Sequence, residues 1–109
     1  MNHLNSFLIE GNLTATPEYN SLKNRCIFTI ESMRYYNQDN EKKVEVSRFD
    51  VETWNNNAQL CMKALSKGRG VRVVGRVKAV DGIAIVIGET VEFKARLDKK
   101  PSEVGYDRP

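Results

Sequence analysis

The chain has 109 residues with a formal net charge of +3, and 40% of them are hydrophobic. This length accommodates one folded domain and excludes a second core, and no apolar run approaches the ~20 residues of a membrane span, so no membrane segment is expected. Because Cys26 and Cys61 form no metal-spaced pair and residues 1–14 lack a basic signal-peptide region, we expect buried, reduced thiols in a cytoplasmic protein, with one disulfide as the alternative.

The first half of the chain predicts three strands separated by polar segments. Residues 5–13 alternate apolar and polar side chains as a strand does, whereas residues 14–24 contain a proline and no clear period and are expected to form a loop. A long strand is predicted over 25–36, which is rich in β-branched and aromatic residues. The polar residues 37–43 predict a mobile hairpin loop, and 44–54 predict the third strand.

One helix is predicted after the third strand. Asn55 to Asn57 are expected to cap its start, and Gly68 is expected to end it as a C-cap glycine. Its apolar face is predicted from the spacing i, i+3, i+4 and i+7, which is occupied by Ala58, Cys61, Met62 and Leu65.

Two further strands are predicted over residues 71–80 and 83–95. The Asp81-Gly82 pair between them is a strong signal for a two-residue hairpin turn. Gly75 interrupts the apolar face of the first of these strands and predicts a bulge or a sharp bend, and Gly88 predicts a bend in the second.

The element order is therefore three strands, one helix and two strands. In a small all-β chain this order favours a closed five-stranded barrel, because closure removes exposed strand edges. The helix between the third and fourth strands is expected to plug one end of the barrel, which is the arrangement of an OB-fold. We expect the domain to occupy residues 1–96, followed by a short flexible tail over 97–109.

Positive charge is concentrated between Thr53 and Val80, a stretch without Asp or Glu that carries Lys63, Lys67, Arg69, Arg72, Arg76 and Lys78. The only tryptophan, Trp54, lies at its start and alternates with Arg48, Asp50 and Glu52, which predicts that the indole is on the polar face. A basic surface beside an aromatic ring suits a polyanion whose bases can stack. The alternative is that these charges only keep the domain soluble.

Several segments resemble the bacterial single-stranded DNA-binding protein family. They are Phe7 to Leu13 with the following Pro17-Glu18, Phe28 to Ile30, Phe49 to Trp54 with the helix, and Val71 to Val77. The resemblance extends over residues 4 to 95. It implies an OB-fold that binds single-stranded DNA with little sequence preference during replication, recombination and repair at the nucleoid. It also implies a homo-oligomer, with a tetramer favoured and a dimer as the alternative.

On this resemblance, Tyr36 takes the position of a stacking tryptophan and Trp54 that of a stacking phenylalanine. Tyr35 is expected to point to the opposite side of the strand, and Phe28, Phe49 and Phe93 are expected in the core. For Arg72, Arg76 and Lys78, on the strand predicted over 71–80, the alternatives to DNA contact are contact with a partner subunit or exposure to solvent. The candidate contacts to the DNA backbone are Arg34, Arg48, Arg72, Arg76 and Lys78.

The chain departs from the family in three ways, of which the short hairpin and the missing acidic tip favour an alternative function. The hairpin at Asp81-Gly82 is shorter than the basic, aromatic loop of typical members. Asp50 stands where the family often has a basic residue, and its carboxylate would repel phosphate. The sequence also ends without the acidic tip that recruits replication and repair proteins. The alternative is a primosome-type accessory protein of the same fold that acts mainly through protein assembly.

An enzyme is not expected. The sequence contains one histidine, no Cys/His metal set, no phosphate-binding glycine loop and no catalytic triad. Glu45, Asp50 and Glu52 are separate strand carboxylates that are more typical of surface charges than of an acid/base pair. No cofactor and no metal are therefore expected.

Overall fold

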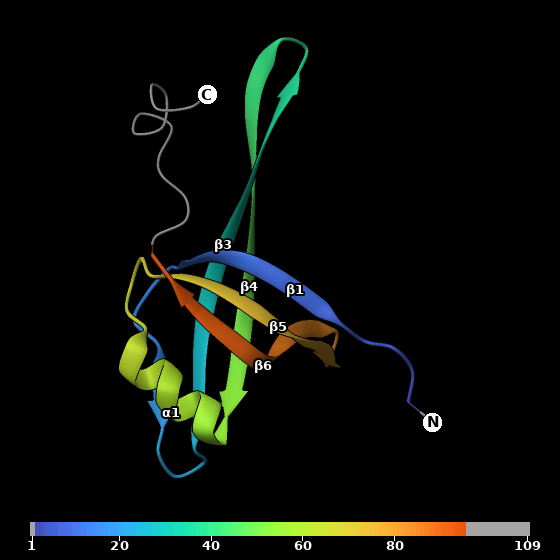
Figure 1. Ribbon diagram of the computed structural model, residues 1–109. Helices are drawn as coiled ribbons and strands as arrows, with labels where there is room; N and C mark the ends of the chain where they lie inside the picture. Colours follow the sequence, from blue (N-terminus) through green and yellow to red (C-terminus); the bar gives the residue numbers. More distant parts are fainter. Residues whose placement is uncertain (1, 96–109) are drawn as a thin grey trace.

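The computed structural model describes residues 2–95, which form six strands and one helix (Figure 1). The elements are β1 (Phe7–Leu13), β2 (Glu18–Asn20), β3 (Arg25–Gln38), β4 (Glu41–Trp54), α1 (Asn55–Ala64), β5 (Gly70–Val80) and β6 (Ile83–Lys94). The predicted tail over 97–109 lies outside the described residues.

Five strands close into a barrel, as the element order predicts. Hydrogen bonds connect them in the order β1-β5-β6-β4-β3, and a further pairing of β1 with β3 completes the ring. The β4–β6 contact is parallel and short, at Val51↔Val86 and Glu52↔Ile87, whereas the other pairings are antiparallel. The expected five-stranded OB-fold barrel is therefore confirmed.

Residues at alternate positions along the strands point inward and fill the barrel. Phe28, Ile30 and Val51 are buried, together with Val71 and Val73 on β5. Of the three phenylalanines predicted in the core, Phe28 is buried. Phe49 and Phe93 are only partly buried and pack against this core.

Helix α1 packs against the barrel through Ala58 and Cys61, which are buried. The predicted apolar face was wrong at Met62, whose side chain is 40% exposed. Within residues 2–95, no helix is long and apolar enough to cross a membrane.

The predicted caps of this helix were also wrong. Trp54 occupies the N-cap position, and no side chain there accepts a capping hydrogen bond. Asn55 has a φ of +57°, a left-handed conformation that asparagine tolerates, so it makes the sharp turn from strand to helix instead. The helix ends at Ala64 with Leu65 as its C-cap, and Gly68 (φ +87°) lies in the following turn, where its N–H donates to the carbonyl of Leu13.

Two segments expected to be loops are partly strand. Within residues 14–24, β2 pairs with β3 at Tyr19↔Cys26. The predicted loop over 37–43 is a two-residue turn at Asp39 and Asn40, both with positive φ, and the β3–β4 register continues to Gln38↔Glu41. As a result, β3 and β4 extend well beyond the barrel as a two-stranded ribbon (Figure 1).

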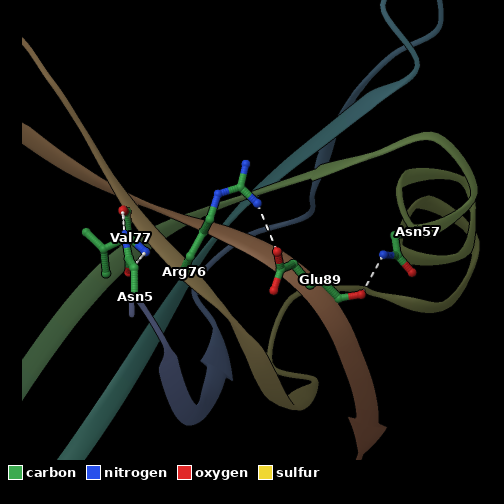
Figure 2. A network of polar contacts seen from close by, with 5 residues as sticks. All are labelled: Asn5, Asn57, Arg76, Val77 and Glu89. Carbon is green, nitrogen blue, oxygen red and sulfur yellow. Dashed lines mark hydrogen bonds and ion pairs between the residues drawn. The ribbon is translucent and has the colours of Figure 1, made fainter. Parts of the chain in front are cut away.

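Gly75 marks a bulge, as its position in the apolar pattern predicts. The β5–β6 register shifts between Val74 and Gly75, which leaves Glu89 as the extra residue on β6. The backbone carbonyl of this extra residue is held by helix α1, because the Asn57 side-chain amide donates to it over 2.9 Å (Figure 2). The bulge therefore ties the helix to the barrel.

Candidate nucleic-acid interface

Trp54 ends strand β4 with its indole ring turned outward. Val51 and Thr53 point into the barrel, so alternation turns Trp54 away from it, and the residue is 38% exposed. Its Nε1–H donates to Oε1 of Glu52 over 2.8 Å, which restricts the rotation of the ring. The outward placement agrees with the sequence prediction.

Arg25 lies directly opposite Trp54 in the β3–β4 register. The central carbon of its guanidinium is 5.5 Å from the centroid of the indole, a cation–π contact. The Nε of Arg25 is buried and has no hydrogen-bond partner among residues 2–95. Sequence reasoning missed this residue, because only the cross-strand register brings it to Trp54.

The outward face of β3 and β4 continues from Trp54 to Arg48. Along it, Thr29 donates to Asp50 over 2.7 Å, and Arg48 forms an ion pair with Glu31 at 2.7 Å. Carboxylates therefore lie between the indole and the Arg48 guanidinium. Because the Arg48 side chain is 65% exposed, its ion pair is screened by solvent and stabilises the fold little.

Tyr36 and Arg34 lie on the projecting ribbon. The Arg34 guanidinium carbon is 4.8 Å from the Tyr36 ring centroid, and Arg34 also faces Glu45 at 3.8 Å. Tyr36 lies eleven residues beyond Arg25 on β3, so at ~3.3 Å per residue it is about 36 Å from the row of Trp54. The structure does not bring the two predicted stacking residues into one cluster.

Tyr35 is the more exposed tyrosine of the ribbon, at 49%. Its hydroxyl contacts the sulfur of Met33 at 3.3 Å. Its cross-strand neighbour is Val44, which is 48% exposed, and the row of Met33 holds Val46, which is 41% exposed. The ribbon therefore carries a strip of exposed apolar side chains that includes an aromatic ring.

The predicted contacts on β5 lie elsewhere on the barrel and are mostly neutralised. Arg72 donates to Glu10 over 2.7 Å and faces Glu92 at 3.7 Å, and Arg76 pairs with Glu89 at 2.9 Å (Figure 2). Figure 2 also shows Asn5, whose side-chain amide pairs with both the N–H and the carbonyl of Val77 and so extends the contacts between the N-terminal segment and β5 beyond the Phe7↔Gly75 pair. Within residues 2–95, Lys78 is exposed and makes no ion pair.

The basic surface predicted from residues 53–80 is interrupted by carboxylates. The stretch from Thr53 to Val80 contains no acidic residue, but the fold places carboxylates of β1 and β6 beside its arginines. Arg69 is also occupied, since its Nε donates to the backbone carbonyl of Lys94 over 2.6 Å. The positive charge that is adjacent in sequence is thus dispersed in space.

Both cysteines are free and buried, as expected. Burial raises the pKa of the Cys61 thiol to about 11 and also raises the pKa of Cys26. A thiol with a raised pKa carries little thiolate near neutral pH, so neither cysteine is suited to nucleophilic chemistry.

Two of the solved structures with a similar fold are single-stranded DNA-binding proteins. A Plasmodium falciparum SSB in complex with ssDNA superposes with a TM-score of 0.74 at 19% identity, covering 86% of this chain and 97% of that chain. A small single-stranded DNA-binding protein from Streptomyces coelicolor superposes with a TM-score of 0.70 at 20% identity, covering 86% and 95% respectively. At these identities the likeness establishes the fold.

A sequence model of the single-strand binding protein family matches residues 4–83, which is most of the barrel and includes Arg25, Tyr36 and Trp54. This match agrees with the resemblance drawn from the strand and turn motifs. The chain belongs to the single-strand binding protein family.

Proposed function

We propose that this protein binds and coats single-stranded DNA with little sequence preference, in the cytoplasm at the nucleoid, and so supports replication, recombination and repair. The observation that carries the proposal is the outward indole of Trp54, fixed by Glu52 and bordered by an arginine. A fixed, exposed aromatic ring can stack on any base, because every base has a π-face. Family membership supports the same function.

The proposed DNA path starts on the outward face of β3 and β4, at Trp54 and Arg48. It then crosses to the opposite face of the ribbon, where the register and the alternation of side chains put Arg34 and Tyr36. Bases stack on Trp54 at the barrel end and on Tyr36 at the ribbon end, and Arg34 and Arg48 contact phosphates between them. The ion pairs of both arginines are exposed, so a phosphate replaces the glutamate at little cost. Asp50 lies within this path and limits how closely phosphate approaches.

The basic residues of β5 have a different proposed role. Arg72 and Arg76 already pair with glutamates on a separate face, so they and Lys78 form at most a secondary DNA contact. We propose that this face meets a second copy of the chain. In support, Leu8 and Val74 pair across β1 and β5 and are 67% and 36% exposed.

The proposed assembly is a homo-oligomer, with a tetramer favoured and a dimer as the alternative. Within residues 2–95, β1 pairs with β3 only at Asn12 and Leu13, so its edge from Phe7 to Gly11 is open on that side. An open edge can pair with another strand. Arg72 does not oppose assembly, because Glu10 and Glu92 neutralise it before two copies meet.

A second candidate function is assembly with other proteins, including those of replication and repair. The exposed apolar strip of the ribbon and the apolar β5–β6 hairpin, where Ile83 is 64% exposed, favour it. Such surfaces are typical of protein contacts.

Titration with oligo-dT distinguishes the two candidates. Trp54 is the only tryptophan, so its emission reports directly on the proposed site. We expect strong quenching by the single strand and little by a duplex of equal length. Absence of both quenching and binding at low salt would contradict the coating function and favour the assembly function.

A further inference from the structure

We infer that Arg25 is a DNA-contact residue that binds the phosphate next to the base stacked on Trp54, so that the indole stacks on one of its faces only. This inference rests on the proposed function and adds a residue to its site. Arg25 and Trp54 would then act together without sequence preference, because the indole stacks on the face of a base and the guanidinium binds the adjacent phosphate.

The first observation is that the Arg25 guanidinium has no partner for its donors in the described part of the chain. Residues 2–95 contain six arginines. Five of them form ion pairs with carboxylates or donate to backbone carbonyls, namely Arg34, Arg48, Arg69, Arg72 and Arg76. Arg25 contacts only the indole ring. Apart from the buried Nε, its donors therefore remain available in the planar arrangement that matches a phosphate.

The second observation is that this guanidinium is held in place. Arg25 pairs with Trp54 on β4 and with Asn20 on β2, so its backbone lies between two strands. Its Nε is buried without a hydrogen-bond partner among residues 2–95. The buried Nε and the indole contact restrict the guanidinium, so the partly exposed side chain presents its terminal N–H groups to an anion in a fixed position.

The third observation is the geometry of the ring. The guanidinium occupies one side of the indole, and the Nε1–H is taken by Glu52. The residue is nevertheless 38% exposed. The exposed area is therefore available to one base, with the cation beside it to meet the phosphate of the same strand.

A purely structural role for Arg25 makes a different prediction. If the guanidinium only packs against the indole, its removal changes the accessibility of Trp54 but does not change the salt dependence of DNA affinity. If it binds phosphate, its removal eliminates one counterion-releasing contact. For single strands each such contact contributes about −0.7 to the slope of log affinity against log salt concentration.

The test compares Arg25→Gln with Lys63→Gln, which removes the same charge from an exposed position on α1. Affinity for fluorescein-labelled oligo-dT is measured by anisotropy over a range of salt concentrations. We expect Arg25→Gln to weaken binding about tenfold at low salt and to reduce the magnitude of the slope by about 0.7. Lys63→Gln is expected to keep the wild-type slope. Arg25→Lys is expected to keep the slope but to expose Trp54 to acrylamide quenching, because an ammonium does not cover the ring as a guanidinium does.

A second measurement uses the wild-type protein and does not depend on the folding of a variant. Phenylglyoxal modifies accessible arginines, and mass spectrometry locates the modified residues. We expect oligo-dT to protect Arg25 and to leave the reactivity of Arg69 unchanged, because Arg69 is bound to backbone carbonyls.

The outcomes separate the inference from the proposed function. If oligo-dT quenches Trp54 but Arg25 stays unprotected and Arg25→Gln keeps the wild-type slope, the role of Arg25 is overturned and single-strand binding remains. If oligo-dT neither binds nor quenches the wild-type protein, the proposed function fails and the inference fails with it.

Discussion

Gly75 and Gly88 pair directly across β5 and β6, at the one register shift of that hairpin. Gly75 has no room for a side chain, and a Cβ on Gly88 would make tight contacts with neighbouring side chains. A Cβ on Gly75 would lie 1.8 Å from the carbonyl oxygen of Ile87, and one on Gly88 would lie 3.1 Å from a Thr53 methyl carbon. The two glycines let the strands approach and bend at the point where the barrel closes.

Gly75→Ala is therefore expected to destabilise the fold strongly. The clash is with backbone rather than with a flexible side chain, so the strands must separate, and we expect the free energy of unfolding to fall by about 2–3 kcal/mol. Urea unfolding followed by Trp54 emission measures the change. The control is Gly82→Asn at the hairpin turn, where φ is +81° and no atom lies near the added Cβ. Asparagine tolerates this conformation, and a loss as large as that of Gly75→Ala would contradict the steric argument.

Trp54→Ala is expected to weaken binding of oligo-dT by about 1–3 kcal/mol, the contribution of one stacked base. Because the residue is 38% exposed, the loss of stability is expected to be smaller than for a core residue. Anisotropy of a labelled oligonucleotide measures affinity, and circular dichroism measures folding. Leu60→Ala, at an exposed position of α1, is the matched control and is expected to bind normally. If a folded Trp54→Ala protein bound with wild-type affinity, the indole would not be part of the binding site.

The sequence predicted the barrel well because its signal is local. Alternation identified the inward residues of β3 and β5, such as Phe28 and Val73, and a glycine within an apolar face identified the bulge. Strand β2 was missed because it has three residues and is stabilised by its pairing with β3. The tip of the ribbon, residues 37–38 and 41–43, was predicted as loop because all of its side chains are polar, which leaves no alternation to detect.

The candidate site was harder to predict because it depends on pairs that are distant in sequence. Trp54 follows from alternation alone, whereas Arg25 reaches it only through the β3–β4 register. The carboxylates that pair with the basic residues of the stretch 53–80 were missed for the same reason, because they are distant from it in sequence. The glutamates that neutralise Arg72 lie on β1 and β6, 62 residues away in the case of Glu10.

Leu8→Glu is expected to shift the protein from oligomer to monomer. It places a carboxylate in the exposed apolar pair Leu8–Val74 and next to Glu10 on the same face, so two copies would bring like charges together. Multi-angle light scattering at micromolar concentration measures the mass. Leu22→Glu, at a 97% exposed position in the β2–β3 turn, is the control and is expected to keep the wild-type mass. A wild-type protein that is already monomeric would reject the proposed assembly.

The buried thiol of Cys61 predicts a loss of stability at alkaline pH. Its pKa is raised by burial from 9.0 to about 11, so between these values the unfolded chain releases the proton while the folded protein retains it. Ionisation therefore favours unfolding, and the stabilisation present below pH 9 is lost as the pH rises towards 11. Urea unfolding of wild type and Cys61→Ala at pH 8 and pH 10.5 isolates this effect from other titrating groups. Cys61→Ala is expected to be less stable at pH 8 because of the cavity, but to lose less stability on going to pH 10.5. Equal losses in both proteins would show that the thiol does not contribute to the pH dependence.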